Sequence, residues 1–208
     1  YRTITAVLLL VLLWGCHPAA TEESKEGRSL LEESRQLIAE QDYDDAMDSA
    51  IKALEAAEDI QDYALKADAL CTVSLIDLMA NRDAQSWQRA CEAEAVARAE
   101  NLFRPLCEAL VLKGGVCSYA GISKESNRDD EALIYLREAY DLSQEHGLSP
   151  EHVQACYYIS EIYVNKNRWN DKLVDEWYSL AGRYLEEGEA LAAADSLQDL
   201  SRRSVIFR

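Results

Sequence analysis

The chain has 208 residues and a formal net charge of −17, with 38 acidic against 21 basic side chains. This acidic excess repels phosphate backbones, and the sequence has no basic stripe, so nucleic-acid binding by this segment is not expected. With only 3 Pro and 8 Gly the chain lacks the frequent turns of an all-β fold, and its long runs of Ala, Leu, Glu, Gln and Arg predict an all-α protein. The charge either keeps the surface soluble or attracts a basic partner.

The first predicted segment is an export signal. Residues 4–14 form an apolar run of 11 residues that is interrupted only by Thr5. A bilayer core needs about 20 apolar residues, so the run is too short to span it, but it has the length of a signal-peptide core. We interpret Arg2 as the remnant of the basic region that precedes such a core. We therefore predict that residues 1–15 are a signal peptide.

Leu13-Trp14-Gly15-Cys16 follows the apolar run and resembles the lipobox of bacterial lipoproteins. This resemblance implies that Cys16 is acylated and that the chain is cut just before it, which leaves residues 16–25 as a polar, lipid-anchored tether. It also implies export to the periplasm, outer membrane or surface of a Gram-negative bacterium. A buried helix start and an uncleaved anchor are the alternatives.

Internal repeats follow the tether. Three segments can be superimposed, 44–60, 87–102 and 130–148. We anchor them on Ala53, Ala95 and Ala139, which are spaced by 42 and 44 residues. Seven residues before these anchors stand Ala46, Gln88 and Ala132. A period of this length is typical of helical repeat proteins.

The first copy resembles the tetratricopeptide repeat. Residues 41–47, QDYDDAM, are similar to the turn and second-helix start of that family, and Ala53-Leu54 matches its A-L pair. Three serines stand where the family has its first-helix Gly: Ser34, Ser74 and Ser160. The resemblance covers roughly residues 26–187 and implies an α-solenoid of stacked antiparallel helix pairs. The chain resembles in particular the exported tetratricopeptide modules of Bacteroidetes.

The breaks in the pattern divide the solenoid, predicted over 26–208, into about four repeats. We predict helices near 22–41, 43–60, 62–80, 84–101, 103–121, 128–147, 150–166 and 170–187. The repeats are then approximately 26–60, 62–101, 103–147 and 150–187, and a break at Glu187-Gly188 starts a fifth helix pair over 189–208.

No residue set predicts catalysis, a metal or a cofactor. Cys71, Cys91, Cys107, Cys117 and Cys156 show no C-x-x-C spacing, and the three histidines form no cluster with them in the sequence. We interpret these thiols as small apolar residues at helix interfaces, with one inter-helix disulfide as the alternative. The acidic group from Asp42 to Asp48 lacks the spacing of a calcium loop, and acids are expected in the first turn of a helix. The sequence therefore predicts a protein that is not an enzyme.

The family resemblance also implies a binding groove lined by the first helix of each pair. The matching positions are Arg28, Leu31, Arg35 and Ile38, then Asp68, Cys71, Leu75 and Leu78, and in the last copy Gln154, Tyr157, Glu161 and Val164. The third copy can be aligned in two ways that differ by one residue, and the preferred alignment contributes Leu112, Val116 and Tyr119. A lining that is largely apolar suits a protein or peptide ligand such as an amphipathic helix. The alternative is that these side chains are simply core.

Two functions fit these features. The first is a non-catalytic scaffold of the cell envelope that binds a protein or peptide. The second is the exported sensory module of a truncated membrane-spanning transcriptional regulator or histidine kinase, because the chain starts at Tyr1 and stops at Arg208 beside a helical pattern. A following apolar stretch of about 20 residues would favour the second.

Overall fold

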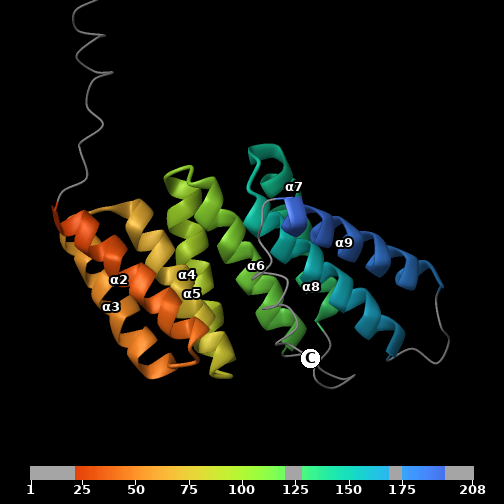
Figure 1. Cartoon of the computed structure of the whole chain (residues 1–208), viewed down its shortest axis with the longest axis horizontal. Coiled ribbons are helices and arrows are strands. Elements are labelled where there is room, and N and C mark those ends of the chain that lie inside the picture. The colour runs from red at the N-terminus through yellow and green to blue at the C-terminus, as the bar shows by residue number, and fades with distance from the viewer. Residues whose placement is uncertain (1–21, 120–127, 169–174, 195–208) are drawn as a thin grey trace, which may run out of the picture.

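The computed structural model describes residues 22–119, 128–168 and 175–194 (Figure 1). The predicted signal peptide, the predicted acylation site Cys16 and most of the predicted tether lie outside these residues, as does everything from residue 195 onward. No helix in the described ranges is both long enough and apolar enough to cross a membrane.

The described residues form an all-helical solenoid, which confirms the predicted fold class. Its helices are α2 (Glu22–Ala39), α3 (Tyr43–Asp59), α4 (Tyr63–Met79), α5 (Asp83–Ala99), α6 (Phe103–Tyr119), α7 (Asp129–His146), α8 (Ser149–Arg168) and α9 (Asp175–Ala194). Consecutive helices pack as pairs, α2 with α3 through α8 with α9, and each pair stacks on the next. Figure 1 shows the pairs following one another in chain order, from orange to blue.

The turns between the first five helices repeat every 20 residues. Gln41, Gln61, Asn81 and Asn101 each follow a helix with a left-handed backbone, at φ values of 55–65°. The residue after each of them donates its N–H to the carbonyl five residues earlier, over 2.8–3.0 Å. This is the Schellman arrangement, which satisfies carbonyls at the helix end. Helices of 17 residues and turns of three therefore make a repeat of 40 residues in this part of the chain, two fewer than the predicted spacing of 42 between the first two segments.

Aspartates begin two of these helices. The Asp62 side chain accepts from the N–H of Leu65 over 3.0 Å, and the Asp42 side chain accepts from that of Asp45 over 3.4 Å. Both are N-caps, which pair amide groups that a helix start leaves free. The hydrogen bond of Asp42 to its own helix agrees with the structural interpretation of the acidic group around it.

Small residues allow the paired helices to approach closely. α3 buries Ala46, Ala50, Ala53 and Ala57, and α5 buries Ser86, Ala90, Ala93 and Ala97 at the same positions 40 residues later. Ala95, the predicted anchor of the second segment, is exposed, and so is Gln88. The predicted alignment of that segment was therefore two residues out. α5 carries alternating alanines, and only packing against α4 and α6 decides which of them faces inward.

Two of the three serines predicted to replace the family Gly meet the backbone of the partner helix. The Ser34 hydroxyl donates to the carbonyl of Ala46 over 2.8 Å, and the Ser74 hydroxyl donates to that of Ser86 over 2.9 Å. The Ser160 hydroxyl instead donates to the carbonyl of Tyr157 in its own helix over 2.7 Å. Gly114 lies 40 residues after Ser74, and a Cβ at this position would stand 2.5 Å from Leu136 Cγ, so Gly114 marks close helix packing.

The end of the described solenoid differs from the prediction. We predicted that Glu187-Gly188 ends a helix, but α9 runs through both residues to Ala194. A Cβ on Gly188 would stand 3.1 Å from Cys156 Cβ of α8. Glycine costs a helix about 1 kcal/mol relative to alanine, and here it permits a close approach of two helices instead of ending one. The predicted start of a fifth helix pair at residue 189 was therefore wrong.

Candidate functional site

The first helices of the pairs form one continuous face. The backbones of α2, α4, α6 and α8 approach one another closely in succession. Within the described ranges no such approach joins α3 to α5, α5 to α7 or α7 to α9. In a stack of helix pairs, the side with the closer spacing is the inner side of the superhelix. We call the surface of α2, α4, α6 and α8 the inner face, and it is where the predicted groove lies.

The apolar part of the predicted lining is mostly buried. Four of the predicted groove residues, Leu31, Ile38, Cys71 and Leu78, are 0–8% exposed and belong to clusters between helices. Leu75, Tyr157, Glu161 and Gln154 are half-buried, while Arg28 and Val164 are exposed. Contrary to the prediction of a largely apolar lining, the inner face offers few apolar side chains to a partner.

The third copy was aligned one residue out. With a 40-residue repeat, Arg28 and Asp68 correspond to Glu108 of α6, which the prediction missed. The predicted Leu112 and Val116 are instead buried with residues of α4 and α5, and the side chain of Tyr119 lies outside the described part of the chain. The 20-residue spacing of the turns in the sequence would have identified Glu108.

Asp68 is the most unusual residue of the inner face. It is 5% exposed, and its Oδ2 accepts from Arg104 Nη2 of α6 over 2.5 Å. Its Oδ1 is buried and has no hydrogen-bond partner among the described residues. Burial raises the pKa of Asp68, against the opposing charge of Arg104. A buried oxygen without a donor costs about 1–3 kcal/mol.

Two further carboxyl groups of the inner face share this environment. Burial raises the pKa of Glu108 to about 7 from its usual 4.5, and the charge of Asp68 contributes in the same direction. Glu151, in the first turn of α8, is 7% exposed, and burial raises its pKa as well. Arg35 and Arg104 oppose both shifts. Arg28 also lowers the pKa of Asp68, so three arginines face the three carboxyl groups, but Arg28 also pairs with Asp62 and Arg35 with Glu32.

We call Asp68, Glu108 and Glu151 the carboxyl cluster. Its members come from α4, α6 and α8, so three repeats must stack before it exists. Arg35 of α2, which opposes their pKa shifts, also pairs with Glu32 over 2.9 Å. The Cys71 thiol ties α4 to α6 by donating to the carbonyl of Pro105 over 3.6 Å. The cluster is therefore held on well-packed helices rather than on loops.

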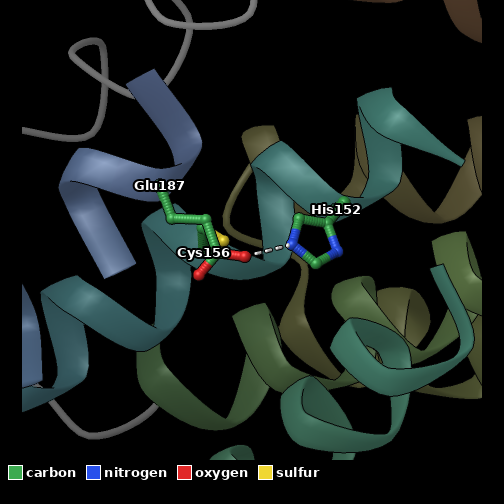
Figure 2. A group of neighbouring side chains, drawn as sticks. All are labelled: His152, Cys156 and Glu187. Carbon is green, nitrogen blue, oxygen red and sulfur yellow. Dashed lines mark hydrogen bonds and ion pairs between the residues drawn. The ribbon is translucent and has the colours of Figure 1, made fainter. Parts of the chain in front are cut away.

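A second polar cluster lies between α8 and α9. Figure 2 shows His152 and Cys156 of α8 together with Glu187 of α9. Their ligand atoms all lie within 4.8 Å of one another, and His152 Nε2 is 3.0 Å from Glu187 Oε1. These residue types are metal ligands. The sequence did not identify this group, because Glu187 is remote from the other two residues in the chain. The available signal was the four-residue spacing of His152 and Cys156 on one predicted helix.

Comparison of the sequence with models of known protein families and with curated proteins gave no match. The arguments for function therefore depend on the geometry of the inner face and of the cluster between α8 and α9.

Proposed function

We propose that this chain is a non-catalytic scaffold of the bacterial cell envelope, built from tetratricopeptide-like repeats, that binds a protein or peptide through its inner face. The observation that carries the proposal is the carboxyl cluster, three acidic groups with raised pKa values on the face made by α2, α4, α6 and α8. Repeat solenoids expose such faces over several units, and this gives an extended partner many points of contact.

The carboxyl cluster specifies the chemistry of the partner. A lysine or arginine side chain of a peptide would bring a positive charge beside half-buried Glu108 and the rest of the carboxyl cluster. The overall charge of −17 would attract such a basic segment from solution. Half-buried Leu75 and Tyr157 provide apolar contacts on the same face. The partner is thus a basic peptide segment rather than the apolar face of an amphipathic helix.

The thiols support a non-catalytic role. Burial raises the pKa of Cys107 and Cys156 to about 12 and that of Cys117 to about 11. A nucleophilic cysteine needs a lowered pKa, because the thiolate is the reactive form. All five described cysteines are free, and all except Cys91 are buried. They fill helix interfaces, as the sequence predicts.

The membrane attachment is part of the same proposal. Acyl chains on Cys16 would hold the protein at a membrane surface, because several chains anchor far more firmly than one. The polar tether would then place the repeats away from the lipid. The inner face remains available to a partner in that arrangement.

Binding of labelled peptides tests the proposal. A set of short peptides, each with one lysine and flanking apolar residues, is compared by fluorescence anisotropy with matched peptides that carry norleucine. We expect lysine peptides to bind at about 0.15 M salt, where long-range attraction is screened. Asp68→Asn and Glu108→Gln should each weaken binding at least about tenfold, the loss expected when one charge-assisted contact is removed.

The control is Glu55→Gln, which makes the same change of charge on the exposed side of α3. It should leave affinity unchanged. If Glu55→Gln weakened binding as much as Glu108→Gln, net charge alone would explain the attraction. If no lysine peptide bound, the proposed function would be wrong.

A further inference from the structure

The cluster between α8 and α9 has the composition of a metal site. His152 and Cys156 are 4% and 0% exposed, and they lie one turn apart on the side of α8 that faces α9 (Figure 2). Glu187 reaches them from α9, with 37% of its side chain exposed. One nitrogen, one sulfur and one carboxylate oxygen therefore converge from two helices on a small volume that solvent reaches from one side.

We propose that His152 Nε2, Cys156 Sγ and the Glu187 carboxylate bind a zinc ion, with water as the fourth ligand. This inference is independent of the proposed function. Zinc takes such donors at about 2.0–2.3 Å in a tetrahedron, which separates nitrogen and oxygen ligands by roughly 3.3 Å. Nε2 and Oε1 are already 3.0 Å apart, and the thiol lies within 4.8 Å of both. Side-chain movements of a few tenths of an ångström, with a larger shift at sulfur, complete the geometry.

The surrounding hydrogen bonds suit a metal-bound histidine. His152 Nδ1 is 2.9 Å from the Ser143 hydroxyl, which in turn donates to the carbonyl of Tyr140 over 2.8 Å. A histidine that binds zinc through Nε2 carries its hydrogen on Nδ1, and the Ser143 oxygen is placed to accept it. The Tyr140 hydroxyl donates to both oxygens of Glu187, over 2.9 and 3.0 Å, and so orients the carboxylate.

Metal binding requires the Cys156 thiol to lose its proton. Zinc coordination replaces that proton, which leaves to solvent, and the S–Zn bond forms as the S–H bond breaks. His152 binds through the lone pair of Nε2 and keeps its hydrogen on Nδ1.

Gly188 gives the site its close spacing. Because it follows Glu187 and its Cα faces Cys156, it lets the backbone of α9 approach α8 at the level of the ligands. A larger residue would separate the two helices there. The zinc ion would thus fasten α9, the last described helix, to α8 and to Tyr140 of α7.

Zinc titration of the full chain tests this inference. The protein is freed of metal with a chelator, kept reduced, and titrated with Zn²⁺ against a chromophoric chelator. We expect one zinc ion per chain and a melting temperature that rises with zinc concentration. With Co²⁺ in place of zinc, a thiolate-to-cobalt charge-transfer band should appear.

Two ligand variants, one matched control and one variant of an orienting residue decide the result. Cys156→Ser should abolish the cobalt band and weaken zinc binding at least about tenfold, whereas Cys107→Ser, which removes another buried thiol, should change neither. Glu187→Gln keeps the size of a partly exposed side chain and should weaken zinc binding even if Cys156→Ser misfolds. Tyr140→Phe should weaken it about 10-fold through the orientation of Glu187. Absence of zinc binding to the wild-type chain, or wild-type affinity in both Cys156→Ser and Glu187→Gln, would overturn the assignment.

Discussion

Replacement of Gly114 by alanine tests the packing between α6 and α7. A methyl group at this position would stand 2.5, 2.6 and 3.1 Å from three atoms of Leu136, which is 0% exposed and cannot move aside. Overpacking costs about 1–3 kcal/mol, and alanine returns about 1 kcal/mol of helix propensity. With three contacts this short the cost falls in the upper part of its range. We expect a net loss of about 1–2 kcal/mol, which lowers the melting temperature by roughly 2–8 °C.

Gly182 of α9 provides the matched control. No atom lies within 4 Å of a Cβ built there, so Gly182→Ala should raise the melting temperature by roughly 1–4 °C through helix propensity alone. Leu136→Ala leaves a cavity and should cost about 2–5 kcal/mol, but adding Gly114→Ala to it should cost nothing further, because the new methyl group fills that space. Additive losses in the double variant, or stabilisation by Gly114→Ala alone, would refute the proposed contact.

Three further predictions concern single positions. The wild-type chain expressed in bacteria should incorporate labelled palmitate and Cys16→Ser should not, so label in the variant would contradict lipid attachment. Ser74→Ala removes two hydrogen bonds of the Ser74 hydroxyl, one to the carbonyl and one with the hydroxyl of Ser86. We expect the free energy of unfolding in urea to fall by about 1–2 kcal/mol, and an unchanged midpoint would contradict this. Burial raises the pKa of Glu108 to about 7 from 4.5, because the folded protein favours the protonated carboxyl group. The protonated group stabilises the fold fully below about pH 4.5, and this stabilisation is lost as the pH rises through 7. Glu108→Gln should therefore raise the free energy of unfolding at pH 8 by up to about 3 kcal/mol and change it little at pH 4, and an equal effect at both pH values would contradict the assigned pKa.

The helices could be predicted from the sequence because residues next to each helix end determine where the helix begins or stops. Asp62 caps one helix, and Asn81 and Asn101 take the left-handed turn that ends others, so the breaks fell close to where the structure has them. The sequence did not show which side of each helix is buried. Ala93 and Ala95 are chemically the same, and only the neighbouring helices determine that Ala93 is buried and Ala95 exposed.

The inner face was predicted in position but not in character. Leu31 and Leu78 were predicted to line the groove, yet in the structure they fill the spaces between helices. The carboxyl cluster depends on residues 40 and 43 positions apart in the sequence, from Asp68 through Glu108 to Glu151. No local pattern marks such residues as neighbours, and the third copy had been aligned one residue out. The repeat length had to be known before Glu108 could be placed beside Asp68.

Gly188 shows why the second cluster was missed. A glycine in a helical pattern indicates either the end of a helix or a close approach of two helices, and the sequence was interpreted as the first. The structure shows the second, since the backbone at Gly188 meets Cys156. Once α9 continues through this point, Glu187 must face α8, and its carboxylate lies beside His152. The error in the helix boundary and the omission of the metal ligands thus have the same physical cause.

The two polar clusters share a feature that distinguishes them from the rest of the solenoid. Elsewhere in the described solenoid most buried positions are apolar, and buried polar groups have partners, such as the Ser34 and Ser74 hydroxyls and Lys113, which pairs with Glu94. At Asp68 a buried oxygen has no donor, which costs about 1–3 kcal/mol in a fold whose net stability is only about 5–15 kcal/mol. Between α8 and α9 a nitrogen, a sulfur and a carboxylate oxygen lie within 4.8 Å of one another. A cation suits both places, as a lysine or arginine side chain beside the carboxyl cluster and as a metal ion between α8 and α9. Local conflicts of this kind are expected at functional sites, and they are the physical reason for placing the binding functions at these two positions.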